Sequence, residues 1–346
     1  MKKSYGIVLI GCGHIGEAHI SDIYYRKGIR IIGVVDVNEE AAKDFAHKYN
    51  AEHWATDYHD LINHPDCDIV IIATYARSHL AILKDCLKAG KHVLCEKPMT
   101  EANIESAKEF YRTVKNAQQK VLIAHVLRHN DTYNKVKDMI RGGAIGDVRL
   151  IRMVQNHHIM NRNRYTQLLK DCPPIVDCGV HYIDVVRWFT GLEITSVYAM
   201  GTDIDHVVTD EYDHGILCMK LENGGSAYYE AGWANNLAAE NLKEFIGTKG
   251  RIRITLVANR PRDNEEGDLI EYYTSEDHCY HTINNPSQYK NMWAQLQTLI
   301  DMIENDDPGN PSFDEAFEAF MIALIGNESA KEHKVMKLDY KWKTEF

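Results

Sequence analysis

The stretch GIVLIGCGHIG, residues 6–16, decides the fold. Its apolar, β-branched run is followed at once by Gly11, Gly13 and Gly16, which have the spacing GxGxxG. In a strand–turn–helix unit the first glycine allows a tight turn, the second lets a phosphate approach the backbone, and the third lets the helix pack against the strand. Asp36 ends the next apolar run twenty residues after Gly16, where a carboxylate that binds a ribose belongs. The stretch therefore predicts a dinucleotide-binding unit; a glycine-rich turn that binds nothing is the alternative.

The same alternation continues over residues 1–127. Apolar runs typical of strands lie at 6–11, 29–36, 67–74, 91–96 and 120–126, and segments typical of helices lie at 21–28, 38–49, 79–90 and 101–118. Near-continuous apolar strands between helices indicate a parallel sheet covered on both faces. We predict an α/β Rossmann domain with a doubly wound parallel sheet.

The pattern changes in the second part, residues 128–346. Strand-like runs follow one another at 147–158, 194–205, 214–234, 242–256 and 269–275, with a hairpin turn at Gly224–Gly225, and helical patterns occupy 288–304 and 313–332. Successive strands joined by tight turns indicate antiparallel or mixed pairing. We predict a second domain of the α+β class.

Charge and hydropathy exclude two kinds of partner. The net charge of −11 at pH 7 argues against nucleic acid, because the phosphate backbone requires a basic surface. No window contains the run of ~18 apolar residues that would cross a membrane. Glycines interrupt the short apolar run near the N-terminus, so no secretion signal is predicted.

The eight cysteines indicate the compartment. They include no CxxC pair, and several lie in apolar runs, as Cys95 and Cys218 do. We expect reduced, buried cysteines in a cytoplasmic protein rather than disulfides or a zinc site.

Asp36 also bears on the choice of cofactor. A carboxylate accepts both ribose hydroxyls of NAD and repels the 2′-phosphate of NADP. Residues 37–40, Val-Asn-Glu-Glu, supply no arginine for that phosphate. NAD is the predicted cofactor and NADP the alternative; Asp36 could also be a solvated residue at the end of a strand.

A second motif, CEKP at residues 95–98, lies at the end of the predicted strand at 91–96. Ligands of open α/β sheets bind beyond the carboxyl ends of the strands, so Lys97 would face the cofactor. Pro98 stiffens the loop and keeps Lys97 extended. Taken alone, the motif could equally be an exposed lysine in a turn.

Together these motifs resemble the glucose–fructose oxidoreductase/inositol dehydrogenase/MocA (Gfo/Idh/MocA) family of nicotinamide-dependent enzymes. The resemblance runs over nearly the whole chain, through the segments 11–16, 73–79 (ATYARSH), 95–98, 142–152 (GGAIGDVRLIR), 177–184 (DCGVHYID), 244–254 (EFIGTKGRIRI) and 315–338. EKP with a later DxGxHxxD is much more specific than GxGxxG alone. The chain departs from the family at Tyr75-Ala76, where Pro-Asn is frequent, and at Cys172-Pro173-Pro174, where a small-residue turn is common.

The resemblance implies a hydride transferred between NAD and a hydroxyl-bearing carbon of a sugar, sugar derivative or cyclitol. It implies that Lys97, Asp177 and His181 are catalytic and that Asp184 binds substrate. Cofactor contacts are expected from Gly11, Gly13, His14, Ile15, Gly16, Asp36, Thr74, His79, Glu96 and Lys97. The second domain of the family usually forms a large open sheet that pairs subunits, which implies a homodimer or homotetramer.

The segment IVDCGVHYID, residues 175–184, has three possible roles. In a helix, Asp177, His181 and Asp184 lie at i, i+4 and i+7 on one face. Pro174 suits the first turn of such a helix and Gly191 follows its end. The face could bind a metal, carry out acid–base chemistry, or lie in water.

Acid–base chemistry is the preferred role. A metal site lacks the compact HExxH pattern and would need help from His157 and His158, so no metal is predicted. A solvated face is disfavoured because the opposite side of the helix is apolar, formed by Val180, Ile183 and Val186.

Oxidation of an alcohol requires loss of the hydroxyl proton as hydride leaves the carbon. The ordinary pKa of histidine is near neutrality, so His181 is the preferred general base. Lys97, near a positively charged nicotinamide and partly desolvated, should have a lowered pKa. It could stabilise the developing alkoxide or act as the base itself, and Asp177 would orient either group.

Other polar residues could line a polyol pocket, although a surface or structural role fits each of them equally: Arg128, Asn156, His157, Arg164 and Tyr165. Trp233 is expected in the core rather than against a sugar ring.

Two other classes of function stay open. A redox-neutral, NAD-dependent glycosidase would use the same Rossmann motifs. A nucleotide-sensing regulator without turnover would need neither Lys97 nor His181, so the presence of both residues counts against it.

Overall fold

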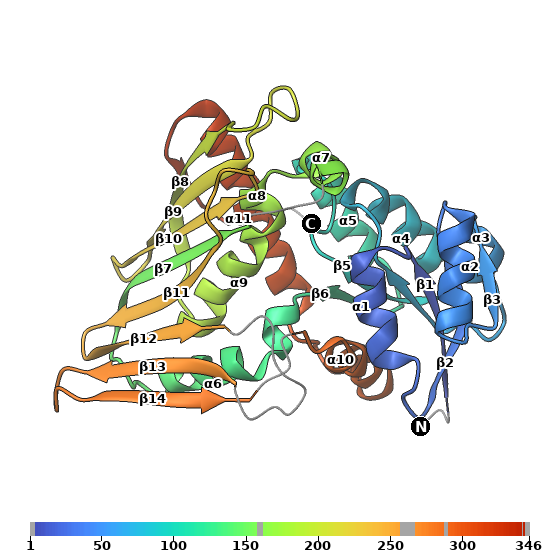
Figure 1. The fold of residues 1–346 in the computed structure, drawn as a ribbon, viewed down its shortest axis with the longest axis horizontal. Helices are drawn as coiled ribbons and strands as arrows, with labels where there is room; N and C mark the ends of the chain where they lie inside the picture. The colour runs from blue at the N-terminus through green and yellow to red at the C-terminus, as the bar shows by residue number, and fades with distance from the viewer. Residues whose placement is uncertain (1–3, 158–161, 257–266, 287–289, 341, 343–346) are drawn as a thin grey trace. The chain divides into compact units, whose positions relative to one another are not determined.

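The computed structural model describes residues 4–157, 162–256, 267–286, 290–340 and 342 of the 346-residue chain. The chain forms two compact units (Figure 1), one of residues 1–129 and 290–317 and the other of residues 130–289 and 318–346. Both units are therefore discontinuous. The return of residues 290–317 to the first unit is not signalled by the sequence pattern.

The first unit is built on a six-stranded parallel sheet with the order β3–β2–β1–β4–β5–β6. This confirms the predicted doubly wound fold. The strand order reverses between β1 and β4, and ligands of open α/β sheets bind beyond the strand ends at such a point. The strands are β1 (Tyr5–Ile10), β2 (Ile29–Val35), β3 (His53–Ala55), β4 (Ile69–Ile72), β5 (His92–Glu96) and β6 (Val121–Ala124).

Six α-helices accompany this sheet in the part of the unit that the structure describes: α1 (His14–Ile23), α2 (Glu39–Lys48), α3 (His59–Ile62), α4 (His79–Lys88), α5 (Ile104–Lys115) and α10 (Met292–Asn305). The helix predicted at 21–28 is wrong in position, because α1 begins directly after the glycine turn and ends at Ile23. The buried face of α1, which includes Ile20 and Ile23, ends at Ile23. Tyr24 and Tyr25 are exposed beyond it.

Helix α10 completes the core of the first unit. Four of its side chains, Leu296, Leu299, Ile300 and Met302, belong to the same buried cluster as residues of β1, β2 and β4. The helix is capped by the side chain of Asn291, which accepts the N–H of Ala294. Burial of such side chains stabilises the unit by about 1.5–3 kcal/mol each.

The second unit is built on a nine-stranded mixed sheet with the order β14–β13–β12–β11–β7–β10–β9–β8–β15. All neighbouring strands are antiparallel except β7 and β10, so the predicted mostly antiparallel sheet is confirmed. The strands are β7 (Val148–Asn156), β8 (Ile194–Thr202), β9 (His214–Leu221), β10 (Ser226–Gly232), β11 (Glu240–Gly247), β12 (Gly250–Thr255), β13 (Asp268–Thr274), β14 (Tyr280–Asn285) and β15 (Met336–Lys337).

The helices of the second unit are α6 (Asp131–Arg141), α7 (Arg162–Asp171), α8 (Pro174–Asp177), α9 (Gly179–Thr190) and most of α11 (Phe313–Glu332). Side chains on one face of the sheet, such as Met153, Tyr229 and Phe245, are buried, and α8 and α9 pack on this inner face. Side chains of the alternate residues point to the opposite, outer face.

Cys218 lies on that outer face and is exposed, so its predicted burial is wrong. The apolar run GILCMKL belongs to a strand whose residues alternate between a buried and a solvated side. Cys12, Cys67, Cys86, Cys95, Cys172 and Cys178 are buried, and all eight cysteines are free thiols.

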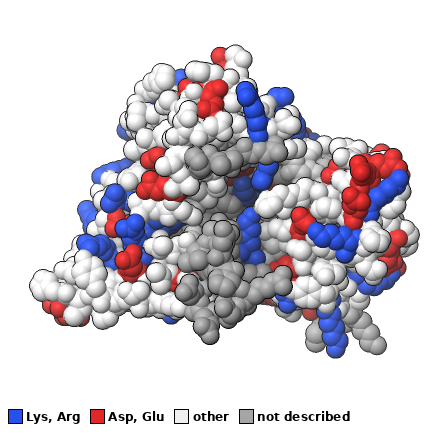
Figure 2. All heavy atoms as spheres, in the orientation of Figure 1, with Lys and Arg blue, Asp and Glu red and all other residues white. Residues whose placement is uncertain are grey.

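Acidic and basic side chains are interspersed over the face seen in Figure 2, without a broad basic surface. Among the helices that the structure describes, none has the length and apolarity needed to span a bilayer.

Candidate active site

The glycine turn has the geometry that a dinucleotide requires. Gly11 has φ +102°, and a Cβ on it would lie 2.5 Å from the carbonyl oxygen of Ala73. A Cβ on Gly16 would lie 1.9 Å from the carbonyl oxygen of Gly11, whereas a Cβ on Gly13 would meet no heavy atom within 4 Å. The first and third glycines therefore serve close packing, and the second leaves open space beside the N-terminus of α1, where a pyrophosphate binds.

Asp36, just after β2, stabilises the glycine turn by hydrogen bonds. Its carboxylate accepts the backbone N–H of Cys12 at 2.8 Å and that of Asn38 at 2.9 Å. The side chain is half-buried, so it is anchored at the end of the strand rather than freely solvated. His14 is exposed and Ile15 half-buried at the start of α1. The two residues follow the open position at Gly13.

Lys97 follows β5 and is half-buried. The carboxylate of the preceding Glu96 binds two groups: Oε1 contacts Nε2 of His19 at 2.8 Å, and Oε2 accepts the backbone N–H of Lys97 at 3.2 Å. Burial opposes ionisation of Glu96, but the hydrogen bond from His19 and the charges of Lys97 and Lys290 outweigh it and lower the pKa of Glu96. A buried carboxylate thus fixes the backbone at Lys97.

The segment after β4 contains the departure from the family pattern at Tyr75-Ala76. Thr74 and Ser78 share a hydrogen bond of 2.7 Å between their hydroxyl groups, and the guanidinium of Arg77 lies over the ring of Tyr75. His79 is fully buried at the start of α4, and its ring nitrogens lie 3.1 Å from the carbonyl oxygen of Thr74 and 2.9 Å from that of Pro98.

In the second unit the predicted single helix over DCGVHYID is wrong. Helix α8 ends at Asp177, and α9 begins at Gly179. Cys178 between them has helical dihedrals but a shortened turn follows it, since the N–H of His181 donates to the carbonyl of Cys178. The predicted ends are confirmed: Pro174 is at the start of α8, and Gly191, with φ +71°, caps α9.

The acidic groups of this segment are buried. Asp177 is 8% exposed and Asp184 is 1% exposed, while His181 is half-buried. The thiol of Cys178 donates to Oδ2 of Asp177 at 3.5 Å. These burials contradict the solvated-face alternative.

Lys243 is a second ionisable group of the inner face, and the sequence reasoning did not single it out. Its side chain is fully buried, with Nζ 3.1 Å from the carbonyl oxygen of Val154 and 4.6 Å from the ring centre of Tyr182 on α9. It also donates to Asn241. Burial lowers the pKa of Lys243 to about 7.

The other predicted pocket residues are placed separately. In the first unit, Arg128 is buried and donates to Asn310 and Glu315, each at 3.3 Å. In the second unit, Asn156 donates to Glu230 at 2.9 Å on the outer face of the sheet. His157 and Arg164 are exposed there, and His158 lies outside the described residues.

Tyr165 packs edge-on against Trp233, with ring centres 6.1 Å apart. Both rings are 2% exposed, which confirms Trp233 as a core residue. Burial and the nearby carboxylates of Asp213, Asp205 and Asp203 raise the pKa of Tyr165. The phenol therefore stays protonated at neutral pH.

No cluster of three histidine, cysteine, aspartate or glutamate side chains within the described ranges could hold a metal ion.

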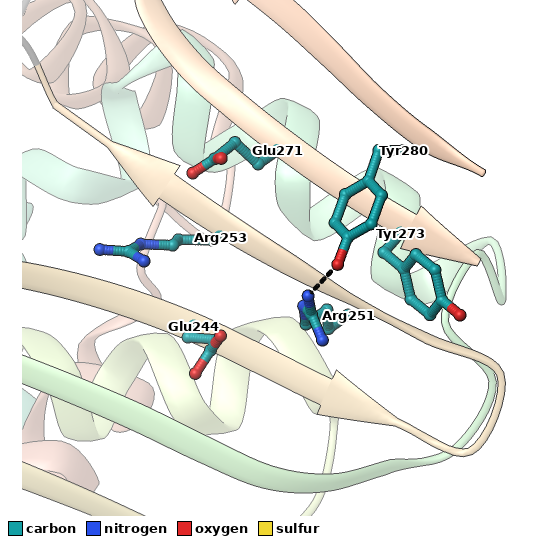
Figure 3. A pocket seen from close by; sticks show the side chains of 6 residues that line it. All are labelled: Glu244, Arg251, Arg253, Glu271, Tyr273 and Tyr280. Atoms are coloured by element: carbon teal, nitrogen blue, oxygen red, sulfur yellow. Dashed lines mark hydrogen bonds between the residues drawn. The ribbon is translucent and has the colours of Figure 1, made fainter. Parts of the chain in front are cut away.

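A shallow polar pocket lies on the outer face of β11–β14 (Figure 3), away from the groups above. Arg253 lies between Glu244 and Glu271 on the neighbouring strands, with which it is in register. Beside it, Arg251 donates to the hydroxyl of Tyr280, and Tyr273 completes the lining.

His19 is the other residue that sequence reasoning missed. It lies on the buried face of α1 with Gly16, Ile20 and Ile23. A histidine three residues after the last glycine of the turn, at a position of the helix that faces the sheet, is the signal that could have found it.

The doubly wound sheet, the open glycine turn and the carboxylate at the end of β2 define a Rossmann-type NAD-binding protein. Residues 5–125 match the model of an oxidoreductase family with an NAD-binding Rossmann fold, GFO/IDH/MocA, and residues 133–253 match the C-terminal domain of the same family. The chain belongs to the GFO/IDH/MocA family of oxidoreductases, and NAD is the cofactor of its first domain.

Individual relatives support this assignment over the full length. A myo-inositol 2-dehydrogenase from Thermotoga maritima is 22% identical over 96% of this chain and 98% of the relative. A scyllo-inositol dehydrogenase structure from Lactobacillus casei is 25% identical, with a TM-score of 0.78 over 97% and 99% of the two chains. An oxidoreductase from Agrobacterium radiobacter in complex with NAD⁺, L-tartaric acid and magnesium is 20% identical, with a TM-score of 0.81 over 96% and 98%.

Proposed function

We propose that this protein is an NAD-dependent dehydrogenase that transfers a hydride between NAD and a hydroxyl-bearing carbon of a sugar, sugar derivative or cyclitol. Membership in the oxidoreductase family supports the reaction class. Relatives named as inositol dehydrogenases support the class of substrate.

One observation carries the proposal. The chain combines an NAD-binding turn with both ionisable side chains that oxidation of an alcohol needs, Lys97 and His181. A protein that only senses a nucleotide needs neither of them. Both lie in structured surroundings, Lys97 beside a buried carboxylate and His181 at the start of α9.

In the proposed reaction the substrate C–H bond breaks with its electron pair and the O–H bond loses its proton, so that a carbonyl forms. NAD, when bound, accepts the hydride. His181 takes the proton as general base, because the ordinary pKa of an imidazole is near neutrality. Lys97 donates a hydrogen bond to the substrate oxygen and stabilises its negative charge as the proton leaves.

The buried carboxylates have supporting roles in this proposal. Asp177 orients the imidazole or the ammonium group by a charge-assisted hydrogen bond. Asp184 accepts hydrogen bonds from substrate hydroxyls. Asn156, His157 and Tyr165 remain candidates for polyol binding. Arg128 is a weaker candidate because its guanidinium is already bound to Asn310 and Glu315.

The experiment is a screen of cyclitols and sugars, including myo-inositol and scyllo-inositol, for formation of NADH by the purified protein. The expected result is NADH and a carbonyl product in equal amounts with at least one compound. Cleavage of glycosides without net NADH would replace the proposal with the redox-neutral glycosidase. Binding of NAD with no turnover of either kind would replace it with the regulator.

The proposal extends to assembly as a homodimer or homotetramer through the outer face of the large sheet. This face exposes apolar side chains, among them Met200 and Val335. It also carries an alternating row of charges across four strands: Arg152, Glu244, Arg253 and Glu271. Such a row can face its own copy with opposite charges paired.

Light scattering at several protein concentrations tests this assembly, with Met200→Glu as the disrupting variant. A monomeric wild type would contradict it.

Free thiols at all eight cysteines support a reducing, cytoplasmic compartment as part of the same proposal.

A further inference from the structure

Two fully buried histidines contact the residues on either side of Lys97. His19, on α1, binds the carboxylate of Glu96, and His79, at the start of α4, binds the carbonyl oxygen of Pro98. All of these residues lie in the first unit. His79 was predicted as a cofactor contact, and no role was predicted for His19.

The contact of His19 fixes its tautomer. Its Nε2 lies 2.8 Å from Oε1 of Glu96, while its buried Nδ1 has no hydrogen-bond partner in the described part of the chain. A proton on Nδ1 would be a buried donor without an acceptor, which costs about 1–3 kcal/mol. With its proton on Nε2, the ring donates to Glu96 and leaves no buried N–H without an acceptor.

His79 has the opposite arrangement. Its Nδ1 lies 2.9 Å from the carbonyl oxygen of Pro98, and its Nε2 lies 3.1 Å from that of Thr74. Both carbonyl oxygens are acceptors, and a neutral imidazole can donate only one N–H. The ring lies within hydrogen-bonding distance of both carbonyl oxygens, so it joins the segment after β4 to Pro98.

These bonds link Lys97 to the cofactor turn. Helix α1, which carries His19, begins at the open glycine where the pyrophosphate binds, and Thr74 follows the switch-point strand β4. Glu96 also accepts the N–H of Lys97 itself. The backbone of Lys97 is thereby held from both neighbours by groups that are anchored in the NAD-binding elements.

We propose that His19 and His79 are positioning residues that hold Lys97 in its catalytic place, His19 through Glu96 and His79 through Pro98. The proposal rests on the catalytic role of Lys97 given above. Neither histidine touches the substrate in this scheme. Each acts by fixing the loop from which the ammonium group extends.

The expected size of the effect follows from geometry. Misplacing a catalytic group by about 1 Å can lower a rate by about a hundredfold. His19→Leu and His79→Leu, which remove the hydrogen bonds but keep an apolar side chain in the core, should each lower kcat about ten- to a hundredfold. For His19→Leu the affinity for NAD should change by less than about threefold, because the glycine turn and Asp36 carry most of that binding. His79 is itself an expected cofactor contact, so kcat of His79→Leu is measured at saturating NAD.

His92→Leu is the matched control. His92 lies at the opposite end of β5, where its Nδ1 accepts the backbone N–H of Lys120 at 2.9 Å. The His92→Leu variant therefore loses a hydrogen bond between a histidine of β5 and the backbone, but it leaves the Lys97 loop unchanged. Its kcat should equal that of the wild type, measured with NAD and the polyol that reacts fastest in the screen.

The decisive measurement places the histidine variants in a Lys97→Ala background. Since the histidines act through Lys97, His19→Leu and His79→Leu should cause no further loss of kcat there. A further ten- to a hundredfold loss in that background would overturn the positioning role while leaving Lys97 catalytic. Wild-type kcat in Lys97→Ala alone would instead refute the proposed function of Lys97.

Two measurements on the protein without substrate or cofactor complete the test. After ¹³C-methylation of the lysines, the Lys97 signal should move in both histidine variants and stay in place in His92→Leu. In ¹⁵N spectra of wild-type histidines, the imidazole signals that disappear in His79→Gln should include a protonated, hydrogen-bonded nitrogen. An unmoved Lys97 signal, or a His79 ring without a hydrogen-bonded N–H, would overturn the corresponding half of the proposal.

Should either leucine variant fail to fold, Glu96→Gln replaces it. The amide keeps the shape of Glu96 but cannot accept from His19 and from the Lys97 backbone equally well, so kcat at saturating NAD should fall. Wild-type kcat in Glu96→Gln would count against the proposal.

Discussion

Alanine substitutions in the glycine turn should separate NAD binding from folding. At Gly13 a Cβ would meet no heavy atom within 4 Å, and φ is −85°, which any residue adopts. At Gly16 a Cβ would lie 1.9 Å from the carbonyl oxygen of Gly11. Gly13→Ala should therefore affect the ligand, and Gly16→Ala should affect the fold.

The stability of Gly13→Ala is the balance of two small effects. Loss of backbone freedom in the unfolded chain stabilises the variant by about 0.4–1 kcal/mol. Replacement of a glycine N-cap by alanine destabilises α1 by roughly 0.5–1 kcal/mol. The net change is close to zero, and the melting temperature without NAD should stay within about 2 °C of the wild type.

NAD affinity should change much more in this variant. The added methyl group occupies the space through which a pyrophosphate reaches the backbone N–H groups at the start of α1. Loss of one hydrogen bond to a charged group costs about 1.5–3 kcal/mol, which corresponds to a Kd roughly 10- to 150-fold higher.

Calorimetric titration with NAD and thermal unfolding without it measure the two effects. Gly16→Ala should instead destabilise the fold and lower the melting temperature by several degrees. An unchanged NAD affinity in a folded Gly13→Ala protein would refute the placement of the pyrophosphate at this glycine.

Four further outcomes are expected. Lys97→Ala and His181→Ala should each lower kcat about a hundredfold or more with little change in NAD affinity, and the double variant should fall well short of the product of the two losses; wild-type kcat in either single variant would remove that residue from the mechanism. Wild-type protein should bind NAD more tightly than NADP, and Asp36→Ala should narrow the difference; equal affinities in the wild type, by calorimetry, would contradict the role of Asp36. Dialysis against a strong chelator should leave activity unchanged, and a loss restored by zinc or manganese would assign a metal to Asp177 and His181. Between about pH 7 and its ordinary pKa of 10.5, Lys243 is protonated only in the unfolded state, so the wild type should gain stability as pH rises through this window. Lys243→Met should be more stable than the wild type at pH 6, and the difference in their free energies of urea unfolding should shrink toward pH 10. A difference that does not shrink would refute the cost of burying Lys243.

Most strands and helices of the first unit were predictable from local patterns, whereas β3, α3 and the position of α1 were not. GIVLIGCGHIG combines a fully buried strand with a turn whose glycines have separate steric reasons. The start of α8 at Pro174 and the end of α9 at Gly191 were likewise predictable from backbone preferences. Such features depend on the chain's own dihedral limits and need no knowledge of distant contacts.

The errors concern features that depend on tertiary neighbours. Cys218 lies in an apolar run, but only alternate residues of β9 face the helices, so the thiol is exposed. The break at Cys178 interrupts a helix whose sequence gives no stop signal beyond Gly179. Lys243 reads as an ordinary charged residue, and only the folded sheet places it beneath Tyr182.

The candidate site was predictable as a set of residue types and not as an arrangement. Lys97 follows from its position after a parallel strand, because such loops meet ligands. The contact of His19 with Glu96 could not be predicted, since it joins residues 77 positions apart. Asn156 was predicted from its residue type, and its hydrogen bond to Glu230 on the outer face could likewise not be predicted from the sequence.

The return of α10 to the first unit has a consequence for how this protein is made. A ribosome releases residues 1–129 long before residues 290–317, so the nascent cofactor domain lacks its last helix while strands β7 to β14 of the large sheet are synthesised. During that interval the surface later covered by Leu296, Leu299 and Ile300 is open to water or to chaperones. A truncated chain ending near residue 127 should therefore aggregate, whereas a fusion of residues 1–129 to 290–317 through a short linker should give a cofactor domain that folds by itself.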